Sequence, residues 1–257
     1  MSSTAQQDHA LDVELEQRAT GSAPQLEAVA RELEAFGATL SHDLRAPLRT
    51  IEGFSRLLQQ PPYAEQLDAT GQDYVQRVHR ASLRLAQMME DLLQLVRLAR
   101  NGIKPERVDL SAMALEILSG LQAATPARRA EFAVEPGIAA HADARLLRLA
   151  LENLLGNAWK FTGRNEVASI FFGRAADAGE AAICVRDNGV GFEQKYADRL
   201  FRAFQRLHSE TEFEGSGIGL AKALRAIHAH GGRIWARGQR GAGAAFYFTL
   251  PGMATAK

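Results

Sequence analysis

Three polar side chains recur at helical spacing within an otherwise apolar segment, ADARLLRLALENLLGNAWKF (residues 142–161). Asn153, Asn157 and Lys160 stand at i, i+4 and i+7, so a helix would place them on one face. An amide oxygen is a hard ligand that suits Mg²⁺, and an ammonium group one turn later suits phosphate. The same residues also fit a solvated helix face, so this motif alone does not establish a site.

Two glycine-rich segments follow this helix. VRDNGVGF (185–192) places Asp187 at the end of an apolar strand, where its carboxylate can accept a hydrogen bond from an exocyclic amine while the glycines turn past a flat ring. EGSGIGLAKALRAI (214–227) sets three glycines before a helix, where free backbone N–H groups favour phosphate. It lacks the GKS/T ending of a Walker loop. An ordinary turn would also explain the first segment.

A histidine and an acid stand side by side in SHDLRAPLRTIEGF (41–54). His42 is two residues from an apolar position on either side, so it is predicted to point away from the apolar stripe of its helix. Pro47 lacks an N–H and its ring crowds the carbonyl of Asp43, so we expect the helix to bend or loosen there. An exposed ring beside a carboxylate suits chemistry, although for a lone histidine a solvated surface position is the more common explanation.

The first part of the chain has the pattern of a helical hairpin. From residue 25 to residue 59, apolar residues recur every three or four positions, and a second such stripe runs from Tyr74 to Leu95 after the breaker cluster PPYAEQLDATG. Two helices leave too much apolar surface exposed to be stable alone. A second copy would complete a four-helix bundle, so we expect a homodimer.

The second part alternates short strand-like runs with helices. AEFAV, ASIFF, AAICVRD, RIWAR and AAFYFTL have the composition of strands, and segments near 110–122, 143–162 and 217–230 have that of helices. This alternation predicts an α/β sandwich.

Composition narrows the class of protein. The chain has 257 residues, 46% of them hydrophobic, and equal numbers of basic and acidic side chains, so it lacks the basic footprint of a nucleic-acid binder. One cysteine, Cys184, excludes an internal disulfide and fits a reducing, cytoplasmic setting. No segment approaches the roughly 18 to 20 apolar residues of a membrane span, so we expect a soluble protein without membrane insertion.

The order of these motifs resembles that of bacterial sensor histidine kinases, over roughly residues 30 to 252. SHDLRAP is similar to the family's H box, LENLLGNAWKF to its N box, DNGVG and GSGIGLA to its glycine boxes, RLFRAFQRL to its phenylalanine box and GAGAAFYFTLP to its closing strand. The sequence around these motifs is most similar to that of the kinase modules of bacterial phytochromes. The resemblance implies a dimerising helical hairpin followed by an α/β sandwich ATP-binding domain of the Bergerat (GHKL) type.

The expected boundaries follow from this assignment. Residues 1–24 form a flexible or partly helical lead, 25–100 the dimerisation and phosphotransfer hairpin, 101–108 a linker, 109–252 the catalytic ATP-binding domain and 253–257 a tail.

The resemblance also implies an activity, ATP-dependent protein-histidine kinase in two-component signalling. His42 would accept the γ-phosphoryl group of ATP and pass it to an aspartate of a response-regulator receiver domain, with Asp43 orienting the ring and accepting a proton. Asn157 would hold Mg²⁺, with Asn153 and Lys160 near the phosphates. The remaining expected nucleotide contacts are Asp187 at the adenine amino group, Gly189 and Gly191 in the base pocket, Gly215, Gly217 and Gly219 at one end of a lid, and Arg206 before that lid.

Two positions depart from related proteins. Relatives that dephosphorylate their partner often carry Thr or Asn four residues after the histidine, where this chain has Ala46, so we expect weak phosphatase activity. Related ATPases carry a Glu one helical turn before the Mg²⁺ asparagine, where this chain has Asn153. This second difference favours transfer to His42 over steady hydrolysis.

Other interpretations stay open. A non-catalytic dimeric phosphotransfer adaptor or scaffold with a degenerate ATP domain would retain the hairpin, and an ATPase or chaperone of the same superfamily would retain the nucleotide domain. The segment before the hairpin is too short for a folded sensor. Either the chain is an excised kinase module, or a sensor or input protein acts on it in trans.

Overall fold

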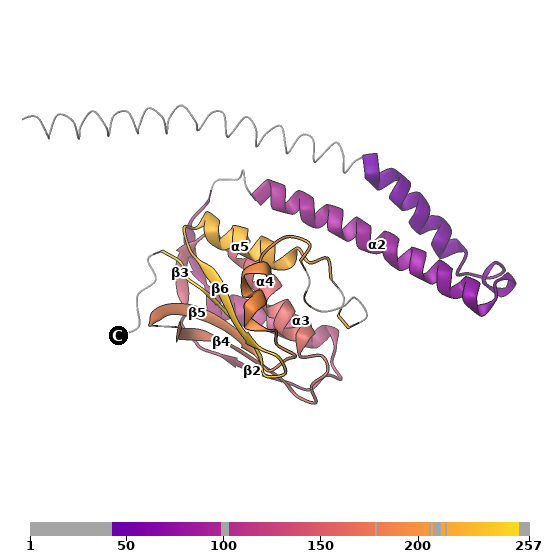
Figure 1. Cartoon of the computed structure of the whole chain (residues 1–257). Helices are drawn as coiled ribbons and strands as arrows, with labels where there is room; N and C mark the ends of the chain where they lie inside the picture. Colours follow the sequence, from indigo (N-terminus) through magenta and orange to yellow (C-terminus); the bar gives the residue numbers. More distant parts are fainter. Residues whose placement is uncertain are drawn as a thin grey trace, which may run out of the picture. The chain divides into compact units, whose positions relative to one another are not determined.

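The computed structural model describes residues 43–98, 103–177, 179–205, 207, 212–213 and 215–251 (Figure 1). They fall into two compact units that divide at the Ser82–Leu83 peptide bond, inside helix α2 (Ala69–Leu98). His42, Arg206, the lead of 1–24 and the tail of 253–257 lie outside the described residues.

The first unit is helical on both sides of a turn, as the apolar periodicity predicts. Residues 43–57 are helical and continue through Pro47, a 3₁₀ turn follows (η1, Ala64–Gln66), and α2 begins at Ala69. Asp68 accepts a hydrogen bond from the backbone N–H of Gly71 (2.7 Å), which caps the start of α2. The helix therefore begins inside the expected breaker cluster.

A polar contact joins the two helices of this hairpin. The Ser55 hydroxyl lies 3.0 Å from Nδ1 of His79. Ser55 is buried, and so is Leu48, two helical turns before it. Several large apolar side chains of the same unit face solvent in the single chain, namely Leu44, Ile51, Phe54, Leu57, Leu58, Tyr63, Tyr74 and Val78. Packing within one hairpin thus covers only part of the apolar stripe.

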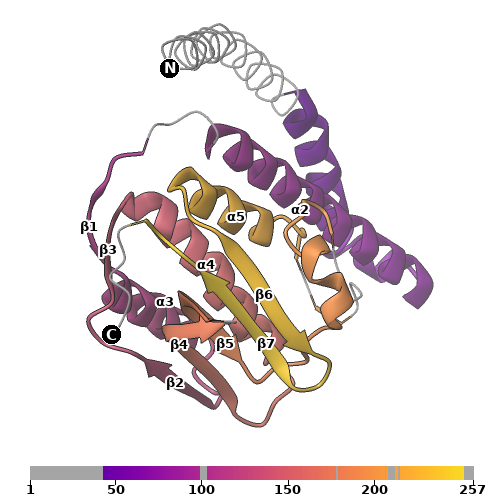
Figure 2. The same ribbon diagram turned by 60° about the vertical axis from the view of Figure 1, so that its left-hand side comes forward.

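The second unit is built on a five-stranded sheet in the order β2-β4-β5-β7-β6. Its strands are β2 (Ala130–Val134), β4 (Ala168–Asp177), β5 (Glu180–Asp187), β6 (Ile234–Gln239) and β7 (Gly243–Phe248). The β2–β4 pair is parallel and the other pairs are antiparallel, with β6 and β7 side by side in Figure 2. Each of these strands overlaps a segment predicted from the sequence, and only the bounds of β6 and β7 cut into the predicted segment.

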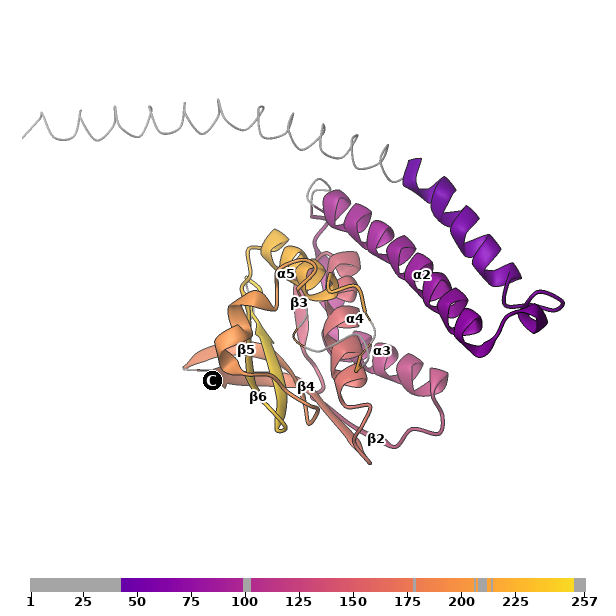
Figure 3. The same cartoon turned by 45° about the vertical axis from the view of Figure 1, so that its right-hand side comes forward.

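Helices cover one face of this sheet, as Figure 3 shows. They are α3 (Leu110–Ala124), α4 (Ala144–Phe161) and α5 (Gly219–Ala229), and α4 packs against both of the others. The core lies between the helices and the sheet, where the fully buried side chains include Leu151 and Leu154 of α4 and Phe172 and Phe248 of the sheet. The predicted α/β sandwich is confirmed.

Two short strands were not predicted. β1 (Glu106–Asp109) and β3 (Ala139–Ala142) form a separate antiparallel pair, so the second half of the expected linker at 101–108 is strand. A second 3₁₀ segment, η2 (Gln194–Arg199), follows the first glycine-rich segment. The Gln194 amide donates to the carbonyl of Ala236 (3.2 Å) and accepts from the N–H of Gly238 (2.9 Å), both on the outer strand β6.

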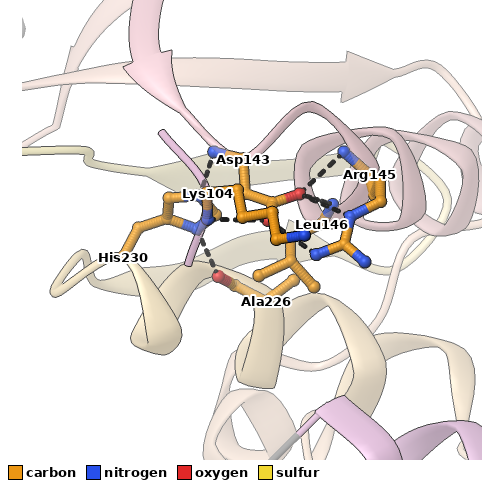
Figure 4. A network of polar contacts seen from close by, with 6 residues as sticks. All are labelled: Lys104, Asp143, Arg145, Leu146, Ala226 and His230. Carbon is orange, nitrogen blue, oxygen red and sulfur yellow. Dashed lines mark hydrogen bonds and ion pairs between the residues drawn. The ribbon is translucent and has the colours of Figure 1, made fainter. Parts of the chain in front are cut away.

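A buried carboxylate fixes the N-terminus of α4 (Figure 4). Asp143 caps the helix by accepting from the N–H groups of Arg145 and Leu146, and it also accepts from the N–H of Lys104 (3.0 Å). The Arg145 side chain and these backbone donors hold the pKa of Asp143 well below its usual range, although burial acts in the opposite direction.

His230, at the C-terminal end of α5, completes this network. Its Nε2 accepts from the N–H of Asp143 (2.9 Å), and its Nδ1 lies 2.7 Å from the carbonyl of Ala226 (Figure 4). Because a carbonyl can only accept, Nδ1 carries the proton. The two helices that flank the candidate site are therefore tied together at these ends.

Within the part of the chain that the structure describes, no helix is both long and apolar enough to cross a membrane. The same residues contain no group of three or more His, Cys, Asp or Glu side chains that could hold a metal ion.

Candidate functional site

A cavity of about 320 Å³ opens in the second unit where α4, the end of β5 and the start of α5 meet. Its wall includes eight of the residues singled out in the sequence, namely Asn153, Asn157, Lys160, Asp187, Gly191, Gly215, Gly217 and Gly219. Segments up to 66 residues apart in the chain thus meet around one space.

The α4 wall presents the predicted polar face. Asn153 donates from its amide to the carbonyl of Leu149 (2.7 Å), which orients its oxygen towards the start of α5. A Cβ atom on Gly219 would lie only 2.4 Å from that oxygen, so the approach of α5 to α4 requires a residue without a side chain. Lys160 also lines the cavity, and its Nζ lies 4.3 Å from the centre of the Phe161 ring.

Asp187 forms the deep polar end of the cavity. The residue is only 6% exposed, and its carboxylate accepts from the N–H of Gly189 (2.8 Å). Burial raises the pKa of this carboxyl to about 6, and the hydrogen bonds from the N–H groups of Gly189 and Ala244 only partly offset that effect. A buried acceptor of this kind is costly unless a donor from outside completes its hydrogen bonding.

The two glycines after Asp187 act differently. Gly191 lines the cavity with φ of 60°, and a Cβ there would meet the carbonyl oxygen of Gln239 at 1.9 Å. Gly189 does not line the cavity, and a Cβ there would lie 2.6 Å from the carbonyl of Phe161. Gly189 therefore allows close packing of the segment against α4 rather than direct contact with the cavity.

The glycine-rich loop before α5 leaves backbone donors available. Ile218 occupies the N-cap position, and its side chain makes no capping hydrogen bond to the first turn of α5. Gly215 and Gly217 both have positive φ, and Gly217 accepts from the N–H of Phe204 through its carbonyl (3.0 Å). The uncapped N–H groups and the positive end of the helix dipole make this wall suited to an anion.

Phe213 is a cavity residue that the sequence did not single out. It is buried, and its ring meets the Phe161 ring edge-on at 4.9 Å between centroids. The Arg164 guanidinium lies over the Phe213 ring, 5.1 Å from its centroid, and forms an ion pair with Glu212. Phe213 is the single aromatic residue in the polar segment SETEFEG, and this feature of the sequence could have identified it as a buried residue.

Besides Gln205, three further polar residues of the wall were also missed. Ser216 belongs to the loop before α5, Lys222 to the first turn of α5, and Asp91 to the part of α2 that lies in the second unit. Asp91 and Lys222 sit inside apolar stripes of their helices, where sequence patterns suggest packing. Asp43, in contrast, is an exposed residue of the first unit and is not among the residues that line this cavity.

The two parts of the chain match two families. Residues 32–101 match the His Kinase A (phospho-acceptor) domain, and residues 142–253 match the family described as histidine kinase-, DNA gyrase B-, and HSP90-like ATPase.

Similar curated proteins are larger. Cyanobacterial phytochrome A of Nostoc sp. is 32% identical to this chain. The methanogenesis regulatory histidine kinase FilI of Methanothrix harundinacea is 33% identical, and the aerobic respiration control sensor protein ArcB of Escherichia coli is 30% identical. Each of the three matches covers 88% of this chain. The chain spans 29%, 25% and 29% of their lengths.

Two solved structures share the fold. Full-length ShkA in complex with AMPPNP is 30% identical, with a TM-score of 0.58 over 84% of this chain and 45% of that one. The histidine kinase AdeS of Acinetobacter baumannii shares the fold at 19% identity, with a TM-score of 0.53 over 82% of this chain and 98% of that one.

Proposed function

Because the chain belongs to the sensor histidine kinases, we propose that it is an ATP-dependent protein-histidine kinase that phosphorylates His42 and passes the group to an aspartate of a response-regulator receiver domain. One observation carries the proposal. Asn157, Lys160, Asp187 and the uncapped start of α5 converge on a single cavity, which supplies groups for a base, a polyphosphate and a cation together.

The base would lie at the Asp187 end. A carboxylate that is buried and short of donors is a selective acceptor for the exocyclic amine of adenine. Gly191 gives the flat ring access to the backbone, and Gly189 sets the position of the Asp187 carboxylate through its N–H.

The phosphates would lie between α4 and the loop before α5. Lys160 and the N–H groups around Gly215, Gly217 and Gly219 are donors for phosphate oxygens, with Asn153 beside them. The proposed role of Arg206, charge stabilisation on the transferred group, rests on the sequence.

The donor set also fits Mg²⁺. Asn157 offers a neutral amide oxygen in a cavity whose other ligands would be phosphate oxygens, the combination in which proteins commonly hold this ion. Bound there, Mg²⁺ would neutralise phosphate charge and fix the geometry of the triphosphate.

His42 would act as the nucleophile. A neutral ring nitrogen attacks the γ-phosphorus, the bond from that phosphorus to the β,γ-bridging oxygen breaks, and ADP leaves with the electron pair. Asp43 next to it would hold the ring and take up the proton released from it. Transfer to the receiver then breaks the N–P bond and forms an acyl phosphate on aspartate.

The hairpin would supply the dimer. Its exposed apolar side chains, among them Ile51, Phe54 and Val78, are left uncovered within one chain, and a second hairpin would bury them in a four-helix bundle. We therefore propose that 25–100 is the dimerisation and phosphotransfer domain, with 109–252 catalytic, and that a sensor or input protein, in the same chain or in trans, acts on the bundle.

Two further features belong to this proposal. Ala46 cannot position a water near His42, so phosphatase activity towards the partner is weak; rapid ATP-independent dephosphorylation of a phosphorylated receiver would contradict this. A cytoplasmic setting is proposed from the single cysteine, Cys184, which is buried and whose pKa burial raises to about 11.

The test uses the purified chain with γ-labelled ATP and Mg²⁺, beside His42→Gln and Asn157→Ala. The proposal expects label that survives alkali, is lost in acid because the N–P bond is acid-labile, and is absent from both variants. Binding of nucleotide without label would instead favour the dimeric adaptor.

A further inference from the structure

A group of polar side chains joins α2 to the start of α5, and we refer to Asp91, Ser216 and Lys222 as the clasp. The Asp91 carboxylate accepts from Nζ of Lys222 (2.8 Å) on one oxygen and from the hydroxyl of Ser216 (2.6 Å) on the other. Gln87 also donates to Asp91 (3.1 Å), and Gln94 accepts from Lys222 (3.1 Å). All of these residues belong to the second compact unit.

The clasp is an internal ion pair rather than a surface one. The side chains of Lys222 and Asp91 are only 10% and 8% exposed. Burial alone would raise the pKa of Asp91, but the hydrogen bonds from Lys222 and Ser216 and the charge of Lys222 outweigh it and hold the pKa below its ordinary value. The carboxylate is therefore ionised at neutral pH.

Stability alone does not account for this pair. Buried ion pairs commonly contribute no more to folding than apolar residues of similar volume, because both charges must leave water. Removing only one partner is much more costly, since it strands the other charge. Lys222 lies three residues after the start of α5, which is otherwise apolar. The function of Lys222 is therefore expected to involve the groups that surround it.

Those surroundings are the nucleotide cavity. Asp91, Ser216 and Lys222 all line it, together with Asn157 and Lys160. Ser216 stands between the two positive-φ glycines of the loop, and Lys222 is in the first turn of α5. An ammonium and a hydroxyl directed at the same anionic group form a suitable donor pair for a phosphate oxygen, and here a carboxylate takes their hydrogen bonds.

We propose that Ser216 and Lys222 form a further subsite for the terminal phosphate of a nucleoside triphosphate, and that Asp91 of α2 occupies this subsite as an internal anion. The inference rests on the proposed function, since it adds residues to the same nucleotide site. An incoming terminal phosphate competes with the Asp91 carboxylate for both donors, and it is repelled while that carboxylate stays.

The competition links the hairpin to the nucleotide. Asp91 lies on the same helix that continues into the first unit, so any change that withdraws this part of α2 frees Lys222 and Ser216 for phosphate. By the reciprocity of linked equilibria, binding of a triphosphate then favours release of α2 by the same factor.

The experiment measures dissociation constants of β,γ-imido-ATP and of ADP for the full chain by calorimetry, with Mg²⁺ present. Asp91→Asn removes the competing charge and leaves Lys222 in place, so the affinity for the triphosphate rises by about tenfold, with a much smaller gain for ADP. Lys222→Met removes the cation and leaves the carboxylate, so the preference for triphosphate over diphosphate falls. Ser216→Ala lowers it less.

A phosphate subsite predicts that the ratio of triphosphate to diphosphate affinity rises in Asp91→Asn and falls in Lys222→Met. A purely structural contact would instead weaken the binding of both nucleotides together. Glu116→Gln is the matched control, because Glu116 pairs with Arg148 at 2.7 Å on the exposed surface away from the cavity. Its affinity ratio stays at the wild-type value.

The double variant Asp91→Leu/Lys222→Met guards against misfolding, because it removes both charges together. It retains cooperative unfolding and loses the gain seen with Asp91→Asn. A ratio that is unchanged, or shifted in the same direction, in Asp91→Asn and Lys222→Met overturns the inference while wild-type binding of β,γ-imido-ATP still supports the proposed function. Absence of wild-type binding overturns both.

Discussion

At the scale of single residues, Asp187 shows how burial prepares a group for binding. Its carboxyl has a pKa of about 6, raised by burial, whereas an unfolded aspartate titrates near 4. The folded state therefore favours the protonated form. Its stabilising contribution is complete below about pH 4 and is lost as the pH rises through about 6.

Asp187→Asn keeps a neutral side chain at every pH and is expected to remove this dependence. The free energy of unfolding of the variant, relative to wild type, rises between pH 4 and pH 7 by up to about 3 kcal/mol, since one pKa unit corresponds to about 1.4 kcal/mol. Urea unfolding across this range without nucleotide provides the measurement. Parallel curves for both proteins would contradict the assigned cause.

Gly219 offers a second prediction at this scale. In Gly219→Ala the new Cβ would meet the Asn153 oxygen at 2.4 Å, so Asn153 must move and its bond to Leu149 weakens. We expect the affinity for an ATP analogue to fall by about tenfold. Gly120→Ala in α3 is the control, because a Cβ there meets nothing within 4 Å, and it should leave affinity unchanged and raise stability by about 0.5 to 1 kcal/mol.

At the scale of elements, the helix that presents the polar face depends on its N-cap. Asp143→Ala removes the cap of α4 together with the contacts to Lys104 and Arg145. We expect a loss of about 2 kcal/mol in the free energy of unfolding, at the upper end for a cap. Asp109→Ala, which removes only the exposed bond to Ala112 at the start of α3, should cost about 1 kcal/mol. Equal losses would show that the buried network adds nothing.

The elements themselves follow from local patterns to different degrees. Apolar periodicity predicted α3, α4 and α5, and strand-like composition predicted the strands of the large sheet, because their apolar side chains form the core. β1 and β3 were missed because ERVD and AAHA are short and partly polar, and they become strands only by pairing with each other. The clasp was missed because Asp91 and Lys222 are 131 residues apart, and no local pattern reports such a contact.

The residues of the site also divide into those that local sequence patterns indicate and those that depend on tertiary contacts. Asn153, Asn157, Lys160 and Asp187, which line one cavity, were singled out because their residue types are unusual at those positions of a helix or strand end. Gly189 was expected in the base pocket but packs against the carbonyl of Phe161, a difference that depends on tertiary distance alone. His42 and Arg206 lie outside the described residues, so their roles stay predictions.

At the scale of the whole molecule, the exposed stripe of the hairpin predicts assembly. Phe54 is 64% exposed in the single chain, and Phe54→Glu would place a charge in the centre of the proposed bundle. We expect the variant to elute as a monomer in size-exclusion chromatography with light scattering, at concentrations where wild type is dimeric. Leu115→Glu, on the exposed side of α3, should remain dimeric. A wild-type monomer at high concentration would contradict the proposed dimer.

The outer strand β6 ends the large sheet, and a free strand edge can recruit another chain through its unpaired backbone groups. Gln194 uses both ends of its amide to occupy two of those groups, on Ala236 and Gly238. One side chain from η2 therefore makes two of the hydrogen bonds that a further strand would make with β6. Concentrated protein should for this reason resist edge-to-edge aggregation, and the side chain that protects it lies far along the sequence from the strand that needs protection.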